Sequence, residues 1–450
     1  MVLAIALVLL VIGSVLFHYL SPWYFQPIAS NWSSIDDTVT VTFWVTGFVF
    51  VVVNVFMAYC VLRYRRRKGS QAHYEPESKK LEGALILATT VGVIAMLAPG
   101  LFAWAKFIEV PKEAAVVEVV GRQWYFNYRF PGKDGVLGTV DAKFVSDENP
   151  FGINPDDPSG QDDILVTTQQ LHLPVGKPVK LELRAIDVLH DFTVPQFRSK
   201  MNMVPGLVTY VWFTPTRTGT FEAFCEQLCG IAHFAMRGKV IVEEESAFQA
   251  WLASYPTFAQ TQARVAGDAE AGKTLYAVCA ACHGAQGEGN PSLNAPKLAG
   301  QGDWYLKRQL RNFKNGTRGT DEKDVSGKTM APMAATLADD AAIDNVVAYI
   351  KTLPDNPAPL TVNGNAKSGH DAYVTCGACH GDNARGIQAM NAPRLKGMSD
   401  WYLVTQLKNF RGGIRGAHPN DVFGRQMGFL AAVLTDQQAA DVVSYVDTLR

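Results

Sequence analysis

Long apolar segments near the N-terminus constrain this chain more than any other feature. Residues 39–62 and 83–107 are apolar runs whose interiors carry no charge. About twenty helical residues span the apolar core of a bilayer, and a helix also satisfies every backbone hydrogen bond there. Both runs are therefore predicted to be transmembrane helices.

The loop between these runs predicts how the chain is oriented. Residues 63–80 contain seven Lys or Arg, four of them in the run 65–68, whereas residues 21–38 contain none. Positively charged loops remain on the cytoplasmic side of a membrane. We therefore expect a multi-pass membrane protein, with residues 63–80 in the cytoplasm and everything after residue 108 outside.

A third apolar segment, residues 1–17, opens the chain. It lacks the charged n-region and the evident small-residue cleavage site of a signal peptide. We predict a third membrane helix over about residues 1–20, and a cleaved signal peptide is the alternative. In either case residues 1–109 form the transmembrane region.

Residues 110–245 change to short alternating apolar runs broken by Pro and Gly. Four such runs are residues 115–120, 179–185, 208–213 and 239–243. Short strands separated by turns are typical of an antiparallel sandwich or barrel. We predict an all-β domain here, followed by a linker over residues 246–266.

A set of soft metal ligands lies at the end of this β region. Two thiolates, an imidazole and a thioether fall within twelve residues, namely Cys225, Cys229, His233 and Met236. This set suits copper, whereas structural zinc, the alternative, rarely binds Met. A mononuclear blue-copper site uses only one Cys, so the second favours two bridged copper ions. A further His is then required, and His190 follows a predicted strand.

The C-terminal half contains two CxxCH motifs, the sequence that attaches haem c through two thioethers with the His as an axial ligand. The motifs consist of Cys279, Cys282 and His283 and of Cys376, Cys379 and His380. They lie in a repeat with an offset of 97 residues, in which 32 of 68 aligned positions are identical. One motif can arise by chance, but two inside a repeat indicate a duplicated haem domain.

Helical periodicity at the end of each copy completes the predicted domains. Residues 343–353 and 440–449 each predict a terminal helix. We expect two all-α domains, which we call the first repeat (residues 267–353) and the second repeat (residues 369–450). A Pro- and Asn-rich linker, residues 354–368, joins them and is expected to be semi-extended.

The repeat also predicts the sixth ligand of each haem iron. The first repeat contains two candidates, Met330 and Met333. In the second repeat, Met427 aligns with Met330, but Leu430 aligns with Met333. Equivalent positions therefore predict Met330 and Met427. His/Met ligation raises the reduction potential of a haem. A Met that only packs against the haem edge is the alternative.

The charge balance limits the classes of partner. The chain has 41 Lys and Arg against 42 Asp and Glu. Nucleic-acid-binding proteins usually carry a basic surplus, so no nucleic acid is expected as a partner.

Residues 35–245 resemble subunit II of haem-copper cytochrome c oxidases, through three segments. They are the CxxxCGxxHxxM loop, the stretch DVLHDFTVP around His190 and the aromatic stretch around Trp124. The resemblance implies a cupredoxin domain with a dinuclear CuA centre, whose ligands are His190, Cys225, Cys229, His233, Met236 and the backbone carbonyl of Gln227. It also implies that electrons from cytochrome c enter through Trp124, which without its motif would more often be a core residue.

Two departures from that family pattern bear on function. The family usually has Glu at position 227, and its carboxylate helps bind magnesium at the boundary with subunit I. Gln227 keeps the carbonyl but not the carboxylate, which puts the magnesium site in doubt. The family's third helix tends to begin LExxWT, and Glu82 matches its Glu, which serves a proton path. Leu85 and Ile86 replace Trp and Thr, so Glu82 is either that proton residue or an interfacial anchor.

The repeats resemble class I c-type cytochromes, di-haem cytochromes c in particular. Together the resemblances imply subunit II of a membrane terminal oxidase, which passes electrons from two haems c through CuA to an oxygen-reducing subunit I that pumps protons. Subunit III and a c-type cytochrome or other periplasmic donor are further expected partners. Two orders of electron transfer are open. Either electrons enter at the distal haem, in the second repeat, and the haem of the first repeat relays them to CuA, or the reverse. A CuA-containing nitric oxide reductase and a membrane-anchored electron carrier are the alternative functions.

Overall fold

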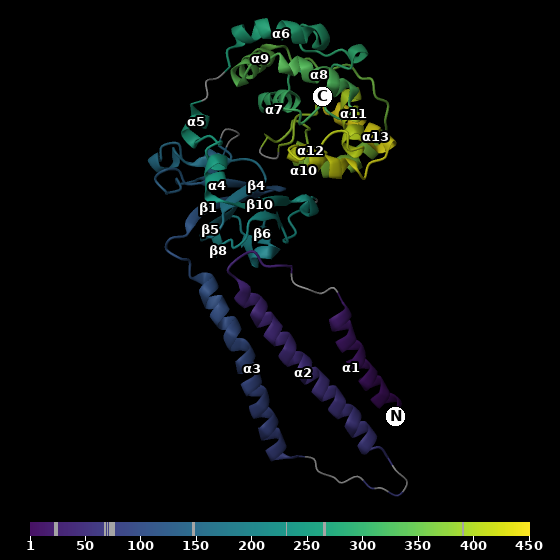
Figure 1. The fold of residues 1–450 in the computed structure, drawn as a ribbon. Helices are drawn as coiled ribbons and strands as arrows, with labels where there is room; N and C mark the ends of the chain where they lie inside the picture. Colours follow the sequence, from purple (N-terminus) through teal and green to yellow (C-terminus); the bar gives the residue numbers. More distant parts are fainter. Residues whose placement is uncertain are drawn as a thin grey trace.

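The computed structural model describes residues 1–21, 26–66, 69, 71, 77–145, 149–230, 232–263, 267–388 and 391–450. Three long helices, a β domain and a helical C-terminal half follow one another along the molecule (Figure 1). This order confirms the predicted multidomain architecture. Arg67 and Lys68 of the expected cytoplasmic loop lie outside the described residues.

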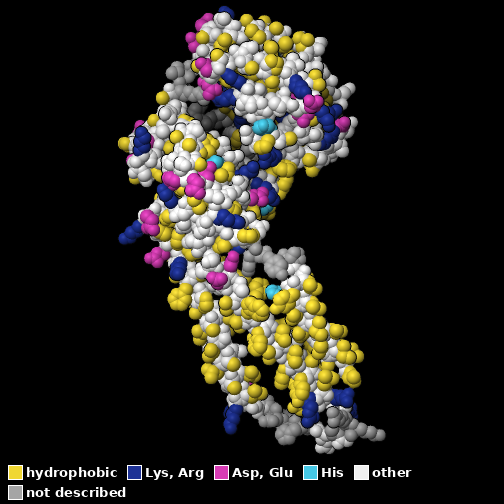
Figure 2. All heavy atoms as spheres, viewed as in Figure 1, with side chains coloured by type: hydrophobic (Ala, Val, Ile, Leu, Met, Phe, Trp, Pro, Cys, Tyr) yellow, Lys and Arg dark blue, Asp and Glu magenta, His cyan; other side chains and the backbone are white. Residues whose placement is uncertain are grey.

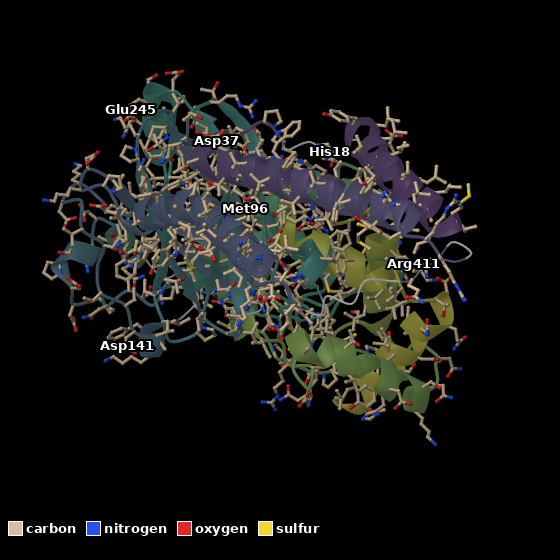
Figure 3. All side chains as sticks on the ribbon, turned by 90° about the horizontal axis from the view of Figure 1, so that it is seen from below. His18, Asp37, Met96, Asp141, Glu245 and Arg411 are labelled. Carbon is tan, nitrogen blue, oxygen red and sulfur yellow. The ribbon has the colours of Figure 1, made fainter. Side chains whose placement is uncertain are left out.

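The N-terminal helices are α1 (Val2–Leu20), α2 (Ser33–Arg63) and α3 (Lys79–Ile108), and each is long and apolar enough to cross a membrane. Their surfaces are almost entirely hydrophobic, and Lys and Arg gather at the ends remote from the β domain (Figure 2). His18 of α1 and Met96 of α3 lie on separate helices, away from Asp141 of the β domain (Figure 3). Most of the described apolar side chains on these helices are exposed, as expected of helices that face lipid.

The β domain is attached to the top of these helices by side-chain contacts. The indole of Trp32 is buried, donates to the carbonyl of Trp212 at 2.9 Å and packs 5.2 Å from the ring of Phe107. Arg198 holds Asp36 of α2 through two bonds of 2.6 and 2.7 Å. The membrane helices and the β domain are therefore joined directly.

Two five-stranded sheets form the β domain, in the orders β3-β2-β1-β5-β8 and β4-β10-β9-β6-β7. The strands are β1 (Ala115–Arg122), β2 (Tyr125–Phe130), β3 (Ile164–Val166), β4 (Gln170–Pro174), β5 (Val179–Ala185), β6 (His190–Val194), β7 (Ser199–Met203), β8 (Thr209–Phe213), β9 (Gly219–Phe224) and β10 (Arg237–Glu243). The pairs β1–β5 and β4–β10 are parallel, whereas the sequence predicted an antiparallel sandwich or barrel. Long connections separate the members of each pair, and such crossovers permit parallel pairing.

Residues 246–266, which were expected to be a linker, carry two short helices in their described part. Helix α4 (Glu245–Leu252) buries Phe248 against the β-sandwich core, and α5 (Phe258–Gln262) buries Phe258. Residues 264–266 lie outside the described residues. Burial of two Phe rings contributes about 1.5–3 kcal/mol each, so most of this segment belongs with the β domain.

The C-terminal half has the same order of four helices twice. The first repeat contains α6 (Ala269–His283), α7 (Asp303–Lys314), α8 (Val325–Ala335) and α9 (Asp340–Thr352), and the second contains α10 (Ala366–His380), α11 (Asp400–Arg411), α12 (Val422–Ala431) and α13 (Asp436–Thr448). In each repeat the first and last helices cross at a glycine. A Cβ on Gly272 or Gly369 would lie 1.9 Å from a carbonyl oxygen of the last helix, so only glycine allows this approach.

Candidate copper and haem sites

The predicted copper ligands come from neighbouring ends of strands in one sheet. His190 is the first residue of β6, Cys225 follows β9 directly, and Met236 precedes β10. The backbone N–H of Cys225 donates to the carbonyl of Met236 at 3.1 Å, which closes the loop between them. Strand pairing thereby brings a His that is distant in sequence next to both cysteines.

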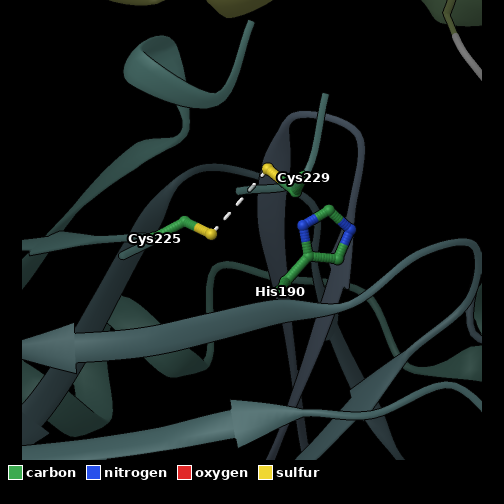
Figure 4. A group of neighbouring side chains, drawn as sticks. All are labelled: His190, Cys225 and Cys229. Carbon is green, nitrogen blue, oxygen red and sulfur yellow. Dashed lines mark hydrogen bonds between the residues drawn. The ribbon is translucent and has the colours of Figure 1, made fainter. Parts of the chain in front are cut away.

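All six predicted ligands lie close together, and His190, Cys225, Cys229 and Met236 are buried. The Sγ atoms of Cys225 and Cys229 are 3.8 Å apart without a disulfide, and the ligand atoms of both and of His190 lie within 4.8 Å (Figure 4). The Sγ of Cys229 is 3.4 Å from His233 Nδ1 and 3.9 Å from Met236 Sδ. Cys225 Sγ is 3.1 Å from the carbonyl oxygen of Gln227.

His190 shows which of its nitrogens is available to a metal. Its Nε2 is 2.8 Å from Asp187, whereas its buried Nδ1 has no hydrogen-bond partner among the described residues. Burial disfavours the imidazolium, but the nearby negative charges of Asp187 and Cys225 raise the pKa of His190 above its ordinary value. A second-sphere carboxylate that orients a ligating imidazole in this way is common in metal sites.

The two thiols cannot both ionise freely without a cation. The hydrogen bond from Cys229 lowers the pKa of Cys225 to about 3, and the contact with the resulting thiolate, together with burial, raises the pKa of Cys229. Two adjacent thiols therefore share one proton, whereas a pair of copper ions would remove both. Two thiolate sulfurs, two imidazoles and a thioether would match the soft ligand preference of copper.

Trp124 lies directly on the copper loop. Its ring is only 3% exposed, and its indole N–H donates to the carbonyl of Cys229 at 3.1 Å. Gly230 follows at φ +121°, and a Cβ there would lie 3.1 Å from the Trp124 ring and 2.8 Å from the Gln123 amide. A side chain at position 230 would therefore displace Trp124.

Each CxxCH histidine has one nitrogen fixed by the backbone. The Nδ1 atoms of His283 and His380 lie 2.7 and 2.8 Å from the carbonyls of Pro296 and Pro393. These carbonyls select the tautomer that leaves Nε2 free for iron. Both imidazoles are buried, and burial lowers the pKa of each, which keeps them in the neutral, ligating form.

One cavity of about 570 Å³ serves both haem motifs and extends across the interface between the repeats. Its lining includes the cysteines and histidine of each CxxCH motif, and Met330 of α8 and Met427 of α12. Met333 also reaches this lining, but it is 42% exposed, whereas Met330 and Met427 are half-buried. The free thiols, ligating histidines and mostly apolar lining fit covalently bound haem.

The remaining predicted residue, Glu82, lies apart from these sites. It is exposed in the first turn of α3, at the end of the helix remote from the β domain. Its role in a proton path stays a prediction.

Sequence reasoning did not anticipate the contact between the second repeat and the β domain. The side-chain amide of Gln426 donates to the carbonyl of Trp124 at 3.0 Å, and that of Asn391 donates to the Tyr125 hydroxyl at 2.9 Å. Phe429 packs edge-on against Phe234 of the copper loop at 5.1 Å. These pairs join residues far apart in the chain, so no local pattern could reveal them.

Comparison with known proteins supports the predicted domain classes in both the β domain and the C-terminal half. Residues 115–244 match the family Cytochrome C oxidase subunit II, periplasmic domain, and residues 269–354 and 366–450 match the family Cytochrome c. The alternative cytochrome c oxidase subunit 2 of Bradyrhizobium diazoefficiens is 58% identical over 264 residues, which are 59% of this chain and 95% of that protein. This chain belongs to the cytochrome c oxidase subunit II family.

Two further relatives show how the parts of this subunit II are combined. The cytochrome c oxidase subunit 2 of Cereibacter sphaeroides is 30% identical over 51% of this chain and 78% of that protein. Cytochrome c4 of Pseudomonas aeruginosa is 36% identical over 42% of this chain and 91% of that protein. The chain is thus a subunit II fused to cytochrome c domains, and membership implies CuA copper, haem c and an electron-transfer role in cytochrome c oxidase, an oxidoreductase. It is anchored by apolar helices with these domains outside the membrane.

Replacing His190 tests the copper ligands. We expect His190→Ala to lose the dinuclear copper centre, because the only ligand outside the loop is removed and the thiolates keep their shared proton. Metal analysis and electron paramagnetic resonance would measure this loss. His172→Ala is the matched control, because His172 is also buried in this domain but pairs with Glu243 at 2.7 Å. A His190→Ala protein with two coppers and an unchanged spectrum would exclude the assignment.

The two methionines of α8 can be distinguished in the same way. We expect Met330→Ala to remove thioether ligation in the first repeat and to lower its reduction potential, because the soft sixth ligand is lost. The exposed Met333 provides the control, and Met333→Ala should leave ligation intact. The absorption band of Met-ligated ferric haem and a redox titration would report both. The reverse pattern would show that Met333 is the ligand.

Proposed function

We propose that this chain is the CuA- and haem-c-bearing subunit II of a terminal oxidase, and that electrons pass from the first repeat to the second, then to CuA, and on to subunit I. Oxygen is reduced to water in subunit I, with proton translocation coupled to that reaction. Two covalent haems and two coppers per chain are part of the proposal. Subunit III is a further proposed partner. The proposed location of the complex is the inner membrane of a bacterium.

The observation that carries this path is the position of the second repeat over Trp124. The Gln426 amide holds the Trp124 carbonyl, and the Trp124 indole in turn donates to the carbonyl of Cys229, a proposed copper ligand. Cys379 of the second CxxCH motif packs against the hydrophobic core of the β domain. Of the two orders that the sequence allowed, these contacts support the second repeat as relay and the first as port.

The same contacts bear on the external donor. Trp124 is only 3% exposed beneath the second repeat, so a diffusing cytochrome cannot reach its ring in this arrangement. We infer that a c-type cytochrome or other periplasmic donor delivers electrons to the first repeat. Fusing the carrier replaces an encounter between molecules with an effective concentration of order millimolar on short linkers.

Deleting residues 267–450 tests the role of the fused repeats. We expect the truncated oxidase to need added soluble cytochrome c for turnover and to become salt-sensitive, because it then depends on a bimolecular encounter. Turnover of the full-length oxidase should respond only weakly to added cytochrome c or to salt concentration. Oxygen consumption measured with and without cytochrome c at several ionic strengths would show this. Equal turnover and salt dependence in the two forms would contradict the proposal.

The docked position of the second repeat can be tested without removing it. We expect Gln426→Ala combined with Phe429→Ala to slow reduction of CuA by haem about thirtyfold, because an aromatic pair and a hydrogen bond each contribute roughly 1 kcal/mol to docking. The control is Val374→Ala, at a side chain 68% exposed on α10. Rapid-mixing spectroscopy of each centre would give the rates. An unchanged rate with intact spectra would place the path elsewhere.

A further inference from the structure

The second repeat binds the β domain through one face, which α12 and the loop before α11 form. Two aromatic rings of this face pack edge-on against rings of β2 and of the copper loop, at 5.3 and 5.1 Å. Two side-chain amides donate hydrogen bonds beside them. We call these four side chains the docked face, and they are Asn391, Phe423, Gln426 and Phe429. The docked face is thus complementary to the aromatic surface beside the copper site.

The first repeat presents the equivalent face, which we call the free face. At the repeat offset of 97 residues, it consists of Asn294, Ser326, Thr329 and Pro332. All four are exposed, and within the described residues the only hydrogen bond from their side chains runs from Thr329 to a carbonyl of its own helix. Asn294 is identical to its counterpart and has the same left-handed backbone, at φ +53° against +54°. Helix α8, which carries the other three, lies on the side of the repeats remote from the β domain (Figure 1).

The free face differs from the docked face in the size of its side chains. Ser326, Thr329 and Pro332 stand where the docked face has Phe, Gln and Phe. Buried aromatic rings supply much of the binding free energy of a protein interface. A face without them makes a smaller and weaker contact, which suits a partner that must leave after each encounter.

The charge around α8 is nearly balanced. Residues 321–328 contain three Asp or Glu and two Lys, and Lys328 pairs with Glu322 at 3.7 Å. Such a surface attracts neither a strongly acidic nor a strongly basic partner. Ser326 and Thr329 also line the cavity of the haem motifs, so a protein bound to this face lies beside the first haem motif.

We propose that the free face is the docking surface for a small soluble blue-copper protein with an apolar, weakly charged contact surface. The argument is the internal repeat, because the equivalent face of the second repeat already binds a β domain beside its copper site. The inference rests on the order of electron transfer in the proposed function. In each encounter one electron passes from Cu(I) of the donor to ferric haem of the first repeat, and the donor leaves as Cu(II).

The test mixes purified full-length oxidase with reduced azurin, a small blue-copper protein, and follows haem reduction by rapid-mixing spectroscopy. We expect Pro332→Glu to slow the second-order reduction about tenfold, because a charge without a partner weakens a neutral contact. Asn294→Ala should slow it about threefold, because one hydrogen bond is lost. The unmodified rate should change less than about twofold between low and high salt.

The matched control is Val374→Glu, which adds the same charge at an exposed side chain of α10 and should leave the rate unchanged. Pro332 does not line the haem cavity, so ascorbate should reduce the haems of every variant at one rate. Unchanged reduction of Pro332→Glu by azurin would overturn the inference, and so would equal slowing of Val374→Glu. Faster, strongly salt-dependent reduction by a Lys-rich cytochrome c would also overturn it.

A second measurement needs no variant. Oxidised azurin should slow amide hydrogen exchange in α8 of the unmodified oxidase and leave exchange in α10 unchanged, because only the free face is covered. Unchanged exchange in α8 at saturating azurin would overturn the inference even if Pro332→Glu did not fold. Reduction of CuA ahead of both haems would instead refute the order of electron transfer in the proposed function.

Discussion

The contact between the second repeat and the β domain is the interaction on which the proposed function depends. It covers Trp124, whose indole is bonded to the copper loop, and it is made by two amide hydrogen bonds and by pairs of aromatic rings. Without it the chain would be a membrane-bound copper domain and a pair of haem domains on a tether. With it, the haem motif of the second repeat and the copper site are neighbours.

The copper site itself depends on strand pairing. Five of the six proposed ligands lie in one loop, but the Nδ1 of His190 reaches them only because β6 pairs with β9 in the same sheet. Asp187 then holds the opposite nitrogen of that ring. A group outside the proposed ligand set thus orients His190, which is usual in metal sites.

The repeats use their duplication to build an interface as well as two haem pockets. Equivalent Arg, Tyr and Gln side chains meet there as pairs, and the cavity that they line is continuous. Lys297 and Arg394, another equivalent pair, both bind Asp355 in the segment between the repeats. Salt bridges therefore fix the expected semi-extended linker to both repeats, and the two repeats are not independent of each other.

The sequence alone determined the classes of domain, the CxxCH motifs, the copper loop and the three apolar helices, because each rests on local spacing or on a repeat that can be counted. It also predicted His190, through its motif. The tertiary structure decided which repeat lies beside the copper site, that residues 245–262 pack on the β domain, and that two sheet pairs are parallel. These features depend on contacts between residues that are far apart in the chain, such as Gln426 and Trp124, and no local pattern records such a contact.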